Sequence, residues 1–74
     1  MSVFDLKKGE SGRIISVAVD GAAGERLRSL GVTVGQRVKA IAFSLLNGSV
    51  LIAAGYNRIG IRKSVAQRIE VEKC

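Results

Sequence analysis

The chain has 74 residues, which corresponds to one small domain over residues 1–74. Its 12 basic and 6 acidic side chains give a net charge of +6, which favours anionic partners such as nucleic acid, an acidic protein surface or the cytoplasmic leaflet of a membrane. A single cysteine excludes an intrachain disulfide, and the absence of histidine excludes a zinc site of cysteine and histidine. No apolar run approaches the roughly 20 residues that span a bilayer, so we expect a soluble, cytoplasmic protein.

The first half of the sequence predicts a strand followed by a short helix. Residues 13–19 are rich in β-branched side chains, as strands are. Residues 22–30 are the only segment of helical length, and a helix places Leu27 and Leu30 on one face because they lie three apart. Gly31 suits the left-handed conformation that closes a helix. These residues are assigned to the fold, and Leu30→Ala is expected to cost about 2–5 kcal/mol if Leu30 is buried.

Two further predicted strands, residues 36–46 and 49–54, flank the dipeptide Asn47-Gly48. This dipeptide favours a two-residue hairpin turn, because both residues tolerate positive φ. The inward-facing positions are even-numbered in both strands, however, so a two-residue turn would set the inner face of one strand against the outer face of the other. The sequence therefore predicts either a loop of odd length, which pairs Ala40 with Ala54, or a β-bulge that shifts the phase.

The last part of the sequence predicts two more strands and one turn of helix. Residues 58–62 and 68–72 alternate between apolar and polar side chains, as half-buried strands do. Between them, Ser64 and Gln67 have the spacing of a capping box. Five short strands, one short helix and a one-turn helix describe a mainly-β, strongly bent small barrel, whose closure hides the sheet edges.

The predicted outward side of the second and third strands carries an apolar patch with basic residues beside it. We interpret this patch as a protein-docking surface, although an exposed apolar patch also favours self-association. The alternative is that Phe43 and Leu45 cover the end of the barrel as additional core. The docking residues are Ile41, Phe43, Leu45, Leu46 and Leu51, with Arg37, Lys39 and Arg58 as the charged rim.

The sequence offers no recognisable catalytic pattern, so we do not expect an enzyme. It has no histidine and neither of the common glycine-rich phosphate-binding motifs. Of the six carboxylates, only Glu70 and Glu72 share a strand face, where acidic side chains commonly serve solvation. We predict no cofactor-binding or metal-ligating residues. The charge favours nucleic acid, but Tyr56 and Phe43 are the only candidates for stacking on bases.

Several short motifs occur in a characteristic order over nearly the whole chain. They are Leu6-x-x-Gly9 with Ile14, Leu27-x-x-Leu30-Gly31-Val32-x-x-Gly35, Val38, Ile59-x-Ile61-Arg62 and Ala66-x-x-Ile69-x-Val71. This order resembles the FeoA family, small cytoplasmic proteins of bacterial ferrous iron transport with an SH3-like fold. Two features depart from the family pattern: Val34 stands where the family commonly has proline, and the loop of residues 44–49 lacks its usual proline.

The resemblance implies an SH3-like, non-enzymatic accessory protein that acts in transition metal transport. Such proteins are thought to dock on the cytoplasmic GTP-binding domain of FeoB, the membrane Fe(II) transporter, and to modulate it. A basic barrel meeting an acidic domain fits electrostatic steering. Arg28, Arg58 and Arg62 are candidates for an arginine that stabilises phosphoryl-transfer charge in trans, the alternative being that each is an ordinary surface arginine.

Two other functions remain open at this point. A similar SH3-like module forms the C-terminal part of some metal-dependent transcription regulators, but the sequence contains no helix-turn-helix pattern. A stand-alone nucleic-acid-binding barrel is favoured only by the charge, and its phosphate contacts would weaken steeply with salt.

Overall fold

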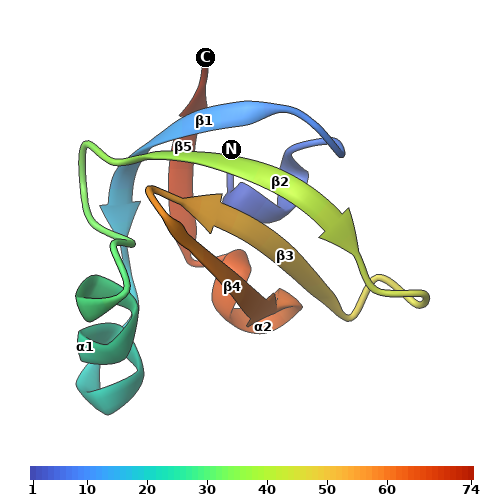
Figure 1. Ribbon diagram of the computed structural model, residues 1–74. Helices are drawn as coiled ribbons and strands as arrows, with labels where there is room; N and C mark the ends of the chain where they lie inside the picture. The colour runs from blue at the N-terminus through green and yellow to red at the C-terminus, as the bar shows by residue number, and fades with distance from the viewer.

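The computed structural model describes residues 1–74 and contains one bent antiparallel sheet with the strand order β4-β3-β2-β1-β5 (Figure 1). The strands are β1 (Ser11–Val17), β2 (Arg37–Phe43), β3 (Ser49–Ala54), β4 (Asn57–Arg62) and β5 (Ile69–Lys73). A 3-10 helix, η1 (Val3–Asp5), precedes β1, helix α1 (Gly21–Ser29) connects β1 to β2, and helix α2 (Lys63–Ala66) connects β4 to β5. The predicted mainly-β fold of five strands with one short helix and a one-turn helix is confirmed. The expectation that closure hides the sheet edges is wrong, because β4 and β5 do not pair and each forms an edge of the sheet.

The core is a single cluster of 16 buried hydrophobic side chains, and no polar or charged side chain is buried. Ile14, Ile52 and Ile69 bring β1, β3 and β5 into this cluster, while Val3 adds η1 and Ala66 adds α2. The two short helices therefore contribute to the core of the bent sheet, on its concave side (Figure 1). Stability rests on apolar packing, as the composition predicts.

Helix α1 is anchored at two points. A Cβ on Gly24 would overlap the carbonyl oxygen of Val19, which directly precedes the N-cap Asp20, so only glycine allows the first turn of α1 to pack this closely on the segment that leads into it. Leu27 is buried, whereas Leu30 is half-buried at the edge of the core. Gly31 has a φ of 96° and closes the helix in the left-handed conformation, as predicted.

Some predicted boundaries are wrong. The first strand begins at Ser11 and ends at Val17 instead of spanning residues 13–19. Helix α2 begins at Lys63, so Ser64 lies inside its first turn and Arg62 is the N-cap, without a capping side-chain hydrogen bond. The capping box predicted for Ser64 and Gln67 is therefore wrong, because the helix starts two residues earlier than that motif requires.

Candidate protein-docking surface

A β-bulge in β2 decides which side chains reach the outer surface. Ala40 lies opposite Ile52 and Ala42 lies opposite Leu51, which leaves Ile41 as an extra residue without a partner. The bulge predicted as one of two ways to resolve the register is thus confirmed, and the odd-length loop that would pair Ala40 with Ala54 is wrong. Before the bulge, the even-numbered residues of β2 face the core. After the bulge, the odd-numbered residues do.

Phe43 changes its predicted position because of this bulge. It lies opposite Val50, which is buried, so Phe43 belongs to the inner side of the hairpin. Its ring packs edge-to-face against Phe4, with the ring centroids 5.5 Å apart, and it is half-buried against the core. The expectation that Phe43 shares the outer face with Leu51 is wrong, and the alternative of Phe43 as additional core is correct.

The loop between β2 and β3 is held together by Ser44. The Ser44 Oγ accepts hydrogen bonds from the backbone N–H groups of Gly48 (2.9 Å) and Ser49 (3.0 Å), and the Ser44 N–H donates to the Ser49 carbonyl. The Asn47 N–H donates to the Ser44 carbonyl, and Asn47 has a positive φ of 54°. The predicted strand therefore ends at Phe43 rather than at residue 46, and residues 45–48 form a four-residue loop in place of a two-residue turn.

Two leucines occupy the tip of this loop. Leu45 is 98% exposed and Leu46 is 90% exposed. Figure 1 shows the loop projecting away from the sheet, beyond the ends of β2 and β3. The alternative that Leu45 covers the end of the barrel is wrong. The two adjacent leucines form a small exposed apolar patch on a well hydrogen-bonded loop, which makes the loop a candidate contact site for another protein.

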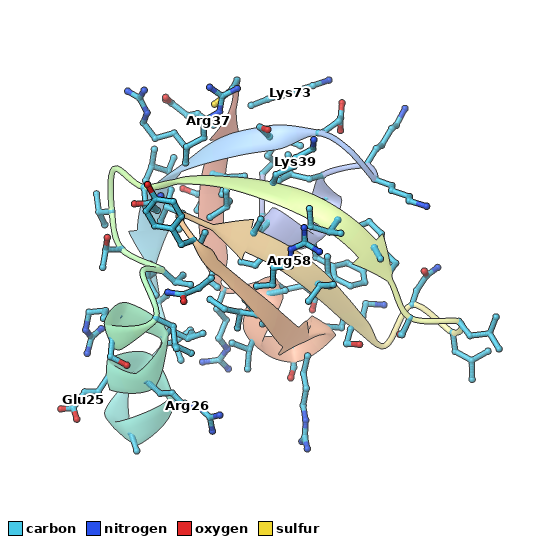
Figure 2. The ribbon with its side chains drawn as sticks, in the orientation of Figure 1. Glu25, Arg26, Arg37, Lys39, Arg58 and Lys73 are labelled. Carbon is cyan, nitrogen blue, oxygen red and sulfur yellow. The ribbon has the colours of Figure 1, made fainter.

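The basic rim lies on the outer face of the sheet. Lys39 is opposite Ala53 and Ala53 is opposite Arg58, so these residues form one row across β2, β3 and β4. Arg37 lies two residues before Lys39 and shares its face. Figure 2 labels Arg37 and Lys39 along β2 and Arg58 over the middle of the sheet, and all three are exposed. Leu51 lies two residues before Ala53 on β3, so this half-buried side chain is on the same face of the sheet as the basic rim.

The basic residues are almost entirely free of internal ion pairs. The only salt bridge in the chain joins Lys73 Nζ to Glu10 Oε2 at 2.6 Å, which leaves 11 of the 12 basic side chains without an acidic partner in the chain. The structure brings together no group of three or more histidine, cysteine, aspartate or glutamate side chains that could hold a metal ion. No helix has the length and hydropathy that crossing a membrane requires.

Sequence reasoning missed one feature, a groove between α1 and β4. Arg26 of α1 lines it together with Arg58 and Arg62 of β4. The alternation of residues 58–62 predicted the strand, but nothing in the sequence indicates that α1 lies beside it.

These observations define a class: a small SH3-like β-barrel whose distinctive features are an exposed leucine loop and a basic outer face. A model of the FeoA domain matches residues 1–73. The chain belongs to the FeoA family, so the assignment predicted from the order of the short motifs is confirmed.

Solved structures give the same result. The FeoA protein from Chlorobium tepidum is 27% identical with a TM-score of 0.93, and the match covers 99% of this chain and 70% of that chain. FeoA from Stenotrophomonas maltophilia is 30% identical with a TM-score of 0.82, covering 97% of this chain and 89% of that one. That protein was solved in complex with zinc and is described as a procaryotic SH3 domain protein and a candidate activating factor of ferrous iron transport.

A regulator of transcription shares the fold alone. A manganese-dependent transcriptional repressor in complex with manganese has a TM-score of 0.82 at 21% identity, and the match covers this whole chain but 36% of the repressor. Among curated proteins, the comparison found no match. The likeness to the repressor therefore concerns the architecture of this module and carries no function to the present chain.

Proposed function

We propose that this protein is a non-enzymatic accessory of ferrous iron uptake that docks on the cytoplasmic GTP-binding domain of a FeoB-type Fe(II) transporter and modulates it. Membership of the FeoA family supports the connection with iron transport. The description of the Stenotrophomonas maltophilia relative as a candidate activating factor supports an accessory role. The observation that carries the docking proposal is the exposure of Leu45 and Leu46 on a loop ordered by Ser44.

The proposed docking surface consists of the residues expected from the sequence, and the structure suggests a different role for each group of them. Leu45 and Leu46 make the apolar contact, because they are the most exposed aliphatic side chains of the chain. Ile41 and Leu51 are half-buried at the base of the hairpin and extend the contact. Phe43 supports the loop from inside through its packing against Phe4 and the core. Arg37, Lys39 and Arg58 form the charged rim.

Charge supports an acidic partner. A net charge of +6 with a single internal ion pair leaves a positive field around the barrel. Rim charges of this kind raise the rate of association with an acidic surface more than they raise the final affinity. Binding to the transporter domain is therefore expected to become slower at high salt while the apolar contact of the loop persists.

Binding of loop variants to the transporter's cytoplasmic domain tests the proposal. We expect the double variant Leu45→Ser/Leu46→Ser to weaken binding by about tenfold or more, because apolar anchors at the centre of an interface dominate its affinity. Its folding should be unchanged, since both side chains already lie in water. Val34→Ser is the matched control, because Val34 is 67% exposed and lies outside the docking surface. Equal binding by wild type and the double variant would exclude this loop as the docking site.

A further inference from the structure

The sheet has two edges, and only one of them is covered. At the β5 edge, the Val71 N–H donates a hydrogen bond to the Met1 carbonyl at 2.8 Å, and Ser2 forms a bridge with Glu70. At the other edge, β4 pairs with β3 and with no other segment. An unpaired strand edge presents free N–H and C=O groups and can accept a further strand.

The free backbone groups of β4 belong to alternate residues. The Lys63 N–H donates to the Gly48 carbonyl at 2.9 Å, which fixes the phase of pairing between β3 and β4. Because antiparallel ladders use every second residue, Ile59 and Ile61 exchange hydrogen bonds with β3. The N–H and C=O groups of Arg58 and Gly60 then point toward the open side. A Cβ on Gly60 would meet no atom within 4 Å, so the outer face of β4 is open at the centre of the strand.

The open edge of β4 borders the groove beside α1. This groove has a volume of about 500 Å³, within the range of ligand-binding clefts. Its apolar lining includes Leu27 and Leu30, and its charged lining consists of three arginines without any carboxylate: Arg26, Arg58 and Arg62. All three arginines are exposed and none forms an ion pair within the chain. Figure 2 shows Arg26 and Glu25 leaving α1 in different directions, with Arg26 on the side of β4.

We propose that the groove between α1 and β4 binds an extended acidic peptide segment, which adds to the sheet as a sixth strand along the free edge of β4. Main-chain hydrogen bonds to Arg58 and Gly60 supply register and affinity in this mode of recognition. The arginines supply the charge preference. A second copy of this chain is a poor occupant, because antiparallel pairing of two β4 strands around Gly60 would set arginine opposite arginine.

The side chains of β4 alternate between the two faces of the sheet, and this alternation predicts the sequence pattern of the peptide. Arg58 and Arg62 point to the outer face with Gly60 between them, and Ile59 and Ile61 point inward. An added strand therefore places acidic side chains beside the two arginines, four residues apart, and apolar side chains toward Leu30 and Val65 in the groove. A peptide in which acidic and β-branched residues alternate would therefore place its carboxylates beside the arginines and its apolar side chains in the groove. This site is separate from the leucine loop, although Arg58 also belongs to the rim of the docking surface, and it does not depend on the identity of the transporter.

The test uses the full chain and a synthetic seven-residue peptide of alternating glutamate and valine. We expect saturable binding, slower hydrogen exchange of the Gly60 N–H, and about a tenfold loss of affinity when the peptide is N-methylated on the residues whose N–H groups face β4. The double variant Arg58→Glu/Arg62→Glu should lose affinity by a similar factor. Lys8→Glu/Arg13→Glu is the control, because it makes the same charge change at two exposed residues that lie outside both the groove and the docking surface.

Three results would overturn the inference. They are the absence of saturable binding up to about 1 mM peptide, equal affinity for a peptide in which lysine replaces glutamate, and an affinity that N-methylation leaves unchanged. The last result would reduce the interaction to non-specific charge attraction. Because no transporter domain takes part, failure here leaves the docking proposal for the leucine loop untouched.

Discussion

The side-chain amide of Asn57 donates a hydrogen bond from Nδ2 to the backbone carbonyl of Leu30 at 2.9 Å, across 27 positions of sequence. Leu30 is the C-cap of α1 and Asn57 is the first residue of β4. This bond joins the end of α1 to the start of the edge strand β4. The Leu30 carbonyl is free to accept it, because the last carbonyls of a helix have no N–H partner within the helix. The bond therefore helps to set the width of the groove that we propose as a peptide site.

Asn57→Ala is expected to lower the free energy of unfolding by about 0.5–1.5 kcal/mol, the usual net value of one hydrogen bond. Urea denaturation measures this change. Asn57→Asp is the informative comparison, because it keeps the size of the side chain but loses the donor, and it should cost at least as much. An Asn57→Ala variant as stable as the wild type would mean that the bond has no role in holding α1.

Gly24→Ala should destabilise the protein, although alanine is normally the better helix former. A Cβ at this position would overlap the Val19 carbonyl, so the helix must shift. Overpacking of this kind typically costs about 1–3 kcal/mol. The control is Gly60→Ala, where the added methyl meets open space and stability should stay the same or rise slightly. Equal stability of the two variants in thermal denaturation would contradict the close approach of α1 to Val19.

The two leucines of α1 should differ in their contribution to stability. Leu27 is 7% exposed, whereas Leu30 is half-buried at the margin of the core. We expect Leu27→Ala to cost about 2–4 kcal/mol and Leu30→Ala to cost less than half as much, because its side chain keeps part of its contact with water. The value of 2–5 kcal/mol predicted from the sequence for Leu30 depended on full burial. Chemical denaturation of both variants settles the order.

Glu10 makes stability depend on pH in a defined direction. Its carboxylate pairs with Lys73 and also accepts a hydrogen bond from the Lys7 N–H at 2.7 Å, and these contacts hold the pKa of Glu10 below its usual value of 4.5. Because the pKa is lowered in the folded state, the stabilising effect is complete above pH 4.5 and is lost as the pH falls through the folded pKa. Glu10→Gln should melt earlier than wild type at neutral pH, with the difference disappearing in acid. A melting-temperature difference that is constant with pH would contradict this assignment.

The fold could be predicted from the sequence because the patterns that indicate its strands and helix each lie within a few consecutive residues. The alternation of residues 58–62 and the leucine pair of α1 each report the face that packs inward, and the order of the motifs identified the family. The bulge was accessible as one of two alternatives, since the inward positions on the two sides of the hairpin conflict in parity. The sequence could not choose between them, because the length of the loop depends on the Ser44 hydroxyl binding the Gly48 and Ser49 N–H groups.

The candidate site was predicted less completely than the fold. Leu45 and Leu46 lie in water as expected, but Phe43 moved inward because Ile41 occupies the extra position of the bulge. One residue of register moves every following side chain to the other face, so a site built on alternation inherits any error at the hairpin. The groove beside α1 depends on a contact between distant segments, and local patterns contain no information about it.

The most direct test of the central claim is a titration of this protein against the cytoplasmic domain of its FeoB-type transporter, with and without guanine nucleotide, at two salt concentrations. The account predicts saturable binding that persists at the higher salt with slower association, because the leucine loop supplies affinity and the basic rim supplies steering. Nucleotide dependence would assign the interaction to regulation of the GTPase. No binding at either salt, together with tight and steeply salt-dependent binding to RNA or DNA, would contradict the account and make the charge of +6 the better guide to function.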